Sequence, residues 1–223
     1  MTRTVVVALA LLATACVSVG RDFPQLQPDS LVLGQTAISE VIAKYGPPQG
    51  RTKRSSDEPT AASQVNNEDL PAGLRRAPVA GNIETLTYLY ARAAGRGANS
   101  RLLTMSFWND HLASWTYASN FDADNTNFDE SKLPSFANGK TTRADVVREL
   151  GKPGGESVYP FVANQGNRSL SHQYVSTTTN RGFLSSSSET NTKIVRFLFD
   201  PSDRLITSFT QTRTSSGQAR IGS

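Results

Sequence analysis

The feature that most constrains the fold is a short motif that occurs twice in the chain without a gap. Gly34–Pro48 and Gly139–Pro153 share their glycine, threonine, acidic, valine and proline positions in the same order. A sequence that repeats itself in this way indicates two copies of one supersecondary unit, each of which needs a neighbour to bury its apolar face. The chain is therefore expected to be organised as two tandem halves.

Both copies carry the start and stop signals of a short helix. Thr36 and Thr141 are expected to cap the helices by accepting a hydrogen bond from a free backbone N–H of the first turn. Gly46 and Gly151 favour the left-handed conformation that ends a helix, and a proline two residues later prevents its continuation. Helices this short are marginal on their own, so each must dock on another element.

The docking partner is predicted to be an antiparallel sheet. Apolar and polar residues alternate around short polar turns, which is typical of hairpins with one buried face. The alternating stretches are 86–90, 103–107, 113–117, 195–199 and 205–209. We therefore predict an α+β fold of two tandem repeats, in which each short helix or helical pair packs on an antiparallel sheet of about three to four strands.

The amino terminus has the layout of an export signal. Arg3 supplies a positive charge, residues 5–12 are apolar, and the small residues 13–15 precede Cys16. The apolar run is too short to span a bilayer comfortably, since a spanning helix needs about 20 residues. The small residues fit ordinary signal peptidase, whereas the same segment ending in Cys16 resembles a bacterial lipobox, with alanine where leucine is usual.

Cys16 favours the lipobox interpretation, because it is the only cysteine of the chain and stands where lipidation needs a thiol. Acyl chains on its sulfur and amine would hold the mature protein firmly to a membrane. The next residue is Val17 and not aspartate, which by resemblance to Gram-negative lipoproteins favours the outer membrane. The expected location is therefore the outer membrane, with the mature part in the periplasm, and plain secretion is the alternative.

Composition divides the rest of the chain into tandem units and connectors. The stretch 49–82 is polar, contains proline and lacks periodicity, so it is predicted to be a flexible insertion. The predicted segments are a signal peptide at 1–15, a lipidated tether at 16–30, a first repeat at 31–120 that holds this insertion, a linker at 121–135, a second repeat at 136–212 and a flexible tail at 213–223.

Composition and motif spacing also exclude several classes of function. The net charge of +4 comes from scattered basic residues, which are typical of a solvated surface and not of a nucleic-acid site. One cysteine excludes an internal disulfide, and two histidines are too few for a closed zinc site. His111 has Asp110 beside it but no identifiable nucleophile, and His172 is expected at the surface. We therefore predict no enzymatic activity, no cofactor and no metal.

Three aromatic residues are the candidate contacts for a protein partner. Phe107, Trp108 and Trp115 lie in or beside the alternating stretches, whose periodicity favours core packing. Phe107 and Trp108 are adjacent, however, so they point to opposite faces of a strand. An aromatic side chain exposed on a sheet face is a candidate contact, because aromatic residues are enriched among the residues that dominate protein interfaces.

The order of Gly-x-Thr, a short helix with two adjacent apolar residues, Gly-x-Pro and a final aromatic hairpin resembles the SmpA/OmlA (BamE-like) bacterial lipoproteins. The duplication is similar to the tandem β-lactamase-inhibitor-protein fold, and the likeness covers about 33–117 and 136–209. These families imply helices on one face of an antiparallel sheet. They also imply that the other face is often left free for a protein partner, and that no cofactor is bound.

This resemblance leads to two functional hypotheses. The first is an envelope lipoprotein that acts as a protein-binding or scaffold module in outer-membrane or envelope-complex assembly. Its partners would be envelope proteins and, through the lipid anchor, the membrane. The second is a secreted proteinaceous enzyme inhibitor of the β-lactamase-inhibitor-protein type.

Overall fold

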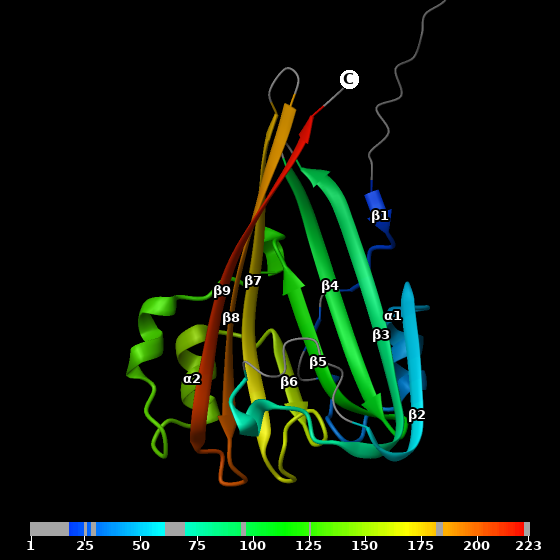
Figure 1. Cartoon of the computed structure of the whole chain (residues 1–223), viewed down its shortest axis with the longest axis vertical. Helices are drawn as coiled ribbons and strands as arrows, with labels where there is room; N and C mark the ends of the chain where they lie inside the picture. The colour runs from blue at the N-terminus through cyan, green and yellow to red at the C-terminus, as the bar shows by residue number, and fades with distance from the viewer. Residues whose placement is uncertain are drawn as a thin grey trace, which may run out of the picture.

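Alternating apolar and polar residues build one continuous antiparallel sheet. The computed structural model describes residues 18–24, 26–27, 30–60, 70–94, 97–124, 126–181 and 185–220. Within them the sheet has nine strands in the order β1-β3-β4-β5-β6-β7-β8-β9, and β2 also pairs with β3 (Figure 1). The strands are β1 (Ser18–Gly20), β2 (Gly50–Thr60), β3 (Val79–Ala94), β4 (Gly97–Trp108), β5 (His111–Ser119), β6 (Gly155–Val158), β7 (Arg168–Arg181), β8 (Ser185–Phe199) and β9 (Leu205–Arg220).

Two α-helices, α1 (Ile38–Tyr45) and α2 (Arg143–Leu150), lie inside the two copies of the repeated motif. Figure 1 shows both helices behind the same sheet. Short 3-10 helices in the connections include η2 (Ala72–Leu74), η3 (Asp122–Asp124) and η4 (Glu130–Ser135). None of the helices in the described part of the chain has the length and apolar character needed to cross a bilayer.

The prediction of two separate helix-on-sheet repeats is wrong, because the strands of both halves join into one sheet. β5 pairs with β6, with Ser114 opposite Ser157 and Thr116 opposite Gly155. A separate sheet in each half would leave two more unpaired edges, whose backbone N–H and C=O groups would need other partners. Pairing β5 with β6 removes both of these edges at once.

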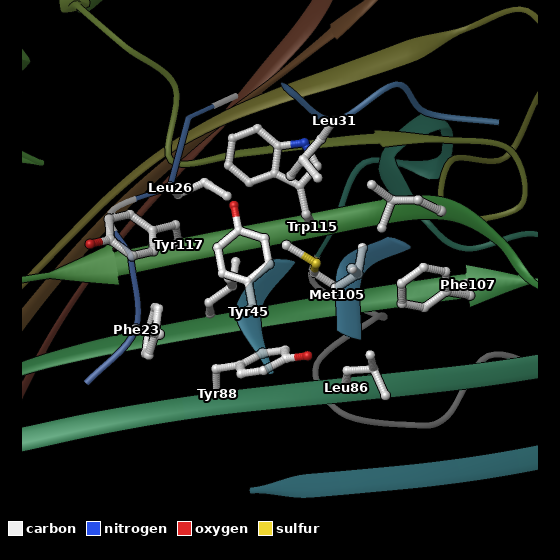
Figure 2. Packing of buried hydrophobic residues seen from close by; sticks show 13 residues of the cluster. Phe23, Leu26, Leu31, Tyr45, Leu86, Tyr88, Met105, Phe107, Trp115 and Tyr117 are labelled. Atoms are coloured by element: carbon white, nitrogen blue, oxygen red, sulfur yellow. The ribbon is translucent and has the colours of Figure 1, made fainter. Parts of the chain in front are cut away.

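Each helix buries its apolar side on the sheet. α1 places Val41 and Tyr45 against β3, β4 and β5, and α2 places Val146 and Leu150 against β7, β8 and β9. Figure 2 shows the first of these clusters, in which the ring centroid of Tyr45 lies 5.9 Å from that of Tyr88 on β3. Side chains alternate between the two sides of a strand, so this packing uses one face of the sheet and leaves the other for different contacts.

The threonines that were expected to cap the helices organise the preceding loops instead. Thr36 Oγ1 accepts a hydrogen bond from the N–H of Val32 at 2.8 Å, and Thr141 Oγ1 accepts one from the N–H of Ala137 at 2.8 Å. Each helix begins one residue later than expected, so neither threonine stands at the N-cap position.

The N-cap residues are Ala37 for α1 and Thr142 for α2. The N–H of Ala37 donates to the Glu40 carboxylate at 2.8 Å, and the N–H of Thr142 donates to the Asp145 carboxylate at 2.9 Å. Only Thr142 also accepts a hydrogen bond through its side chain, from the N–H of Asp145. Hydrogen bonds from Thr142, and then from Arg148, lower the pKa of Asp145 to about 2.

Several segments predicted to be connectors form strands of the sheet. Residues 50–60 of the predicted insertion are β2, and β9 continues to Arg220 through part of the predicted tail. Ser18–Gly20, predicted to be part of the tether, form β1 beside the outer edge of β3. The predicted signal peptide at 1–15 and Cys16 lie outside the described residues.

Candidate partner-binding face

Three rows of side chains cross the face of the sheet opposite α1 and α2, which we call the open face. Directly opposite residues of an antiparallel pair share a face, so the strand register defines these rows. Small hydroxyl side chains make up most of two rows, and aliphatic side chains make up the third. The rows are Thr85, Ser106, Ser114, Ser157 and Ser169; then Thr87, Thr104, Thr116, Ser171 and Arg196; then Leu89, Leu102 and Ala118.

Hydroxyl groups of neighbouring strands form hydrogen bonds across the open face. The side-chain oxygens of Thr85 and Ser106 lie 3.1 Å apart, and those of Ser114 and Ser157 lie 2.7 Å apart. The second of these bonds joins β5 to β6, where the two halves of the sheet meet. Cross-strand hydroxyl pairs of this kind add modestly to sheet stability.

The segment 70–78, which contains η2, covers one end of the open face. Leu74 packs against Leu198 of β8 and Val162. Gly73 permits this close approach, because a Cβ atom at its position would lie 2.5 Å from Cδ2 of Leu198. In Figure 1 this teal segment crosses the sheet in front of the strands, on the side away from the helices.

A pocket of about 220 Å³ lies between this segment and the hydroxyl rows. It brings two arginines together with hydroxyl and apolar side chains. Burial lowers the pKa of Arg196, and burial together with the nearby charge of Arg54 lowers the pKa of Arg76. The pocket is lined by Leu70, Leu74, Arg76, Ser114, Thr116, Ser157, Phe161, Ser169, Ser171 and Arg196.

The aliphatic row of Leu89, Leu102 and Ala118, which we call the open row, lies beyond the segment 70–78. None of these three residues belongs to a core cluster in the part of the chain that the structure describes. Leu102 is 42% exposed although it stands within β4 and pairs with neighbours on both sides. An aliphatic surface on a sheet face is a candidate protein contact.

The three aromatic residues predicted as contacts are not part of the open row. Phe107 and Trp115 are buried on the helix side, in the cluster that Figure 2 shows. Trp108 does lie on the opposite face, but Tyr159 covers it, with ring centroids 5.6 Å apart and the rings nearly perpendicular. Its indole N–H donates to the carbonyl of Ala80 at 3.2 Å. The candidate contact is therefore Leu102 and not one of these three aromatic residues. The sequence signal for it is the adjacent apolar pair Leu102-Leu103, because neighbouring residues of a strand point to opposite faces and only one of the two can face the helices.

The histidines differ in their surroundings. His111 is exposed at the start of β5, directly after the turn that joins β4 to β5. His172 was expected at the surface, but it is only 2% exposed and lies between the rings of Phe128 and Phe197. Its Nε2 donates to the carbonyl of Gly151 at 3.1 Å, its buried Nδ1 has no hydrogen-bond partner among the described residues, and burial lowers its pKa. The described residues contain no cluster of potential metal ligands.

A larger hollow of about 500 Å³ lies beside α2. Its two arginines are paired with carboxylates, Arg143 with Glu156 at 3.0 Å and Arg148 with Asp145 at 2.8 Å. Burial raises the pKa of Glu156, and the charge of Arg143 opposes that rise. Because both arginines are already paired, they are less available to an anionic ligand than Arg76 and Arg196 of the pocket on the open face.

Comparisons with known proteins add little to this geometry. No model of a known protein family matches the chain, including any for the SmpA/OmlA lipoproteins, and no curated protein matches it. A solved structure described as a "putative beta-lactamase inhibitor protein" from Streptococcus mutans is similar with a TM-score of 0.43 and 8% sequence identity. The similarity covers 82% of this chain and 91% of that chain. A likeness this distant supports no conclusion about function.

Proposed function

We propose that this protein is an envelope lipoprotein, anchored through an acylated Cys16, whose open face binds a partner protein. The observation that carries the proposal is the open row, and above all the exposed position of Leu102 within β4. Exposing a leucine to water in the middle of a sheet face leaves apolar area that a partner can bury, at about 25 cal/mol for each Å².

The position of the anchor supports this proposal. Cys16 precedes Ser18 by two positions, so chain length alone keeps the two residues within about 7 Å of each other. Ser18 pairs with Arg92 of β3, and Leu89 of the open row lies on the same strand near that pair. A membrane-bound Cys16 would therefore hold the open row close to the bilayer surface, where an envelope protein could reach it.

The chemistry of the open row favours a protein partner. Leu89, Leu102 and Ala118 offer aliphatic contacts, and the neighbouring row offers hydroxyl groups of Thr87, Thr104 and Thr116. A nucleic acid would instead require a concentration of positive charge along its path. A mixture of apolar and small polar groups is typical of the contact surfaces of proteins.

Site-specific photo-crosslinking in intact cells tests the proposal. A photoreactive phenylalanine analogue at position 102 is expected to give a discrete crosslinked product with an envelope protein. The matched control is the same analogue at Val32, which is 48% exposed in the loop before α1. Products of equal yield at both positions, or none at position 102, would contradict binding through the open face.

The secreted inhibitor remains the alternative function, and the anchor separates the two. The mass of the amino-terminal peptide of the mature protein is expected to include acyl chains on Cys16. Cys16→Ser should release the protein from the membrane fraction without changing its folding. An unmodified Cys16 in protein recovered from the medium would support the inhibitor instead.

A further inference from the structure

The pocket beneath the segment 70–78 contains two guanidinium groups that have no acidic partner among the described residues. The Nε of Arg76 is buried and has no hydrogen-bond partner in the described part of the chain, and its guanidinium carbon lies 4.9 Å from the ring centroid of Phe161. Arg196 on β8 is partly buried, and no described residue forms a hydrogen bond or an ion pair with its side chain. Burying an unpaired charge is costly, so natural proteins rarely place two of them around one pocket without a ligand.

The surroundings of these arginines add positive charge. Burial, and then the charge of Arg54 on β2, lower the pKa of Arg76, so its nearby charged neighbour is another cation. Burial lowers the pKa of Arg196 as well. The described part of the pocket therefore has a positive potential that a bound anion would neutralise.

The hydroxyl groups of the pocket are suitable hydrogen-bond donors for such an anion. Ser114 and Ser157 bond to each other, and either oxygen can be the donor, so one hydroxyl hydrogen of this pair remains available. The side chains of Thr116, Ser169 and Ser171 make no hydrogen bond to another described residue, although all three line the pocket. Hydroxyl groups in these positions can donate to oxygens that the arginines attract.

We propose that this pocket binds a small oxyanion ligand, an organic molecule that carries a phosphate or a carboxylate group. Arg76 and Arg196 would hold the anionic oxygens, because a guanidinium group matches both of these groups with paired N–H donors. Leu70, Leu74 and Phe161 would contact the hydrocarbon part. The volume of about 220 Å³ limits the ligand to a small molecule or to the end of a longer one.

Thermal unfolding of the full mature protein with three probes tests this inference. Inorganic phosphate and glutarate are expected to raise the midpoint with saturation, whereas neutral glutaramide and sodium chloride at equal ionic strength are not. A rise with phosphate only would identify a phosphate group as the ligand feature, and a rise with glutarate only would identify a carboxylate. A rise with neither anion would overturn the proposal.

Three arginine variants show whether the anion binds in this pocket. Arg76→Met and Arg196→Met are each expected to weaken anion binding by at least about tenfold, as measured by titration calorimetry. Without anion, Arg196→Met should be no less stable than the unmodified protein, because the charge it removes has no partner among the described side chains. Arg213→Met removes an exposed arginine of the neighbouring strand β9 and should leave the affinity unchanged. Equal affinity in all three variants would place the anion elsewhere and overturn the proposal.

This inference is independent of the proposed partner protein. Purified protein with small-molecule probes measures anion binding, and crosslinking at position 102 measures contact with a partner in cells. Failure of one experiment therefore leaves the result of the other unaffected.

Discussion

Arg101 of β4 donates two hydrogen bonds to the carboxylate of Asp124 in η3, from Nε at 2.8 Å and from Nη2 at 3.3 Å. Tyr117 and Ser119 of β5 donate to the same carboxylate, whose side chain is almost completely buried. Burial, and then the hydrogen bond to Asp124, raise the pKa of Tyr117. Asp124 thus ties the connection after β5 to two strands of the sheet.

Asp124→Ala is expected to lower the free energy of unfolding by about 3–5 kcal/mol, because Arg101 would remain partly buried without its main partner. Urea unfolding followed by circular dichroism measures this loss. Asp122→Ala is the matched control, since Asp122 is exposed in the same short helix, and it should change stability little. Similar losses for both variants would show that the buried ion pair is not the cause.

The helix caps predict opposite effects of two reciprocal substitutions. Thr142→Ala removes the side-chain cap of α2 and should destabilise the protein by about 0.5–2 kcal/mol. Ala37→Thr adds a hydroxyl where α1 has no side-chain cap and should raise stability by a smaller amount. The midpoints of chemical unfolding of both variants, compared with that of the unmodified protein, measure these effects. An unchanged midpoint for Thr142→Ala would be inconsistent with its capping role.

His172 is expected to make stability depend on pH. Burial lowers its pKa in the folded protein, so below about 6.5 the unfolded chain binds more protons at this residue. The contribution of His172 to the free energy of unfolding should therefore be constant above pH ~6.5. It should fall as the pH decreases from there toward the lower pKa that His172 has in the folded protein. Thermal midpoints between pH 7.5 and pH 5.5 measure the slope, which His172→Phe should reduce and His111→Asn should preserve. The same slope in both variants would rule out His172 as its origin.

Gly73 is expected to set how closely the segment 70–78 packs on β8. Gly73→Ala places a Cβ atom against Leu198 and should destabilise the protein by about 1–3 kcal/mol. Leu198→Ala creates a cavity on its own, but it removes the clash, so the double variant should be more stable than the sum of the single losses predicts. Additive losses in this double-mutant cycle would indicate that Gly73 does not contact Leu198.

Local signals in the sequence were sufficient to predict both helices. The motif at Gly34–Pro48 produced α1, and its copy at Gly139–Pro153 produced α2. The cap position was wrong by one residue because threonine can accept a backbone hydrogen bond in a preceding loop as well as at a helix end. The two edge strands β1 and β2 were missed, since the residues of β2 with described side chains are mostly exposed and lack the alternation that marks a half-buried strand.

The candidate sites were less accessible to sequence reasoning. Arg76 and Arg196 are distant in sequence and meet only because the segment 70–78 folds over β8. The burial of His172 follows from the packing of Phe128 against it, and no sequence spacing joins those residues. Leu102 is exposed because no described segment packs over its end of the sheet, which the strand sequence itself does not specify.

By itself, the sequence determined which segments become helices and most strands, and which side of each strand is apolar. These properties depend on residues within a few positions of one another, through hydrogen bonding and side-chain periodicity. Only the tertiary structure decided that the halves share one sheet, that the arginines meet and that a leucine stays exposed. These outcomes depend on pairing and packing between segments that are distant in the sequence. An unpaired strand edge can bond to the backbone of any other strand, so the local sequence does not specify its partner.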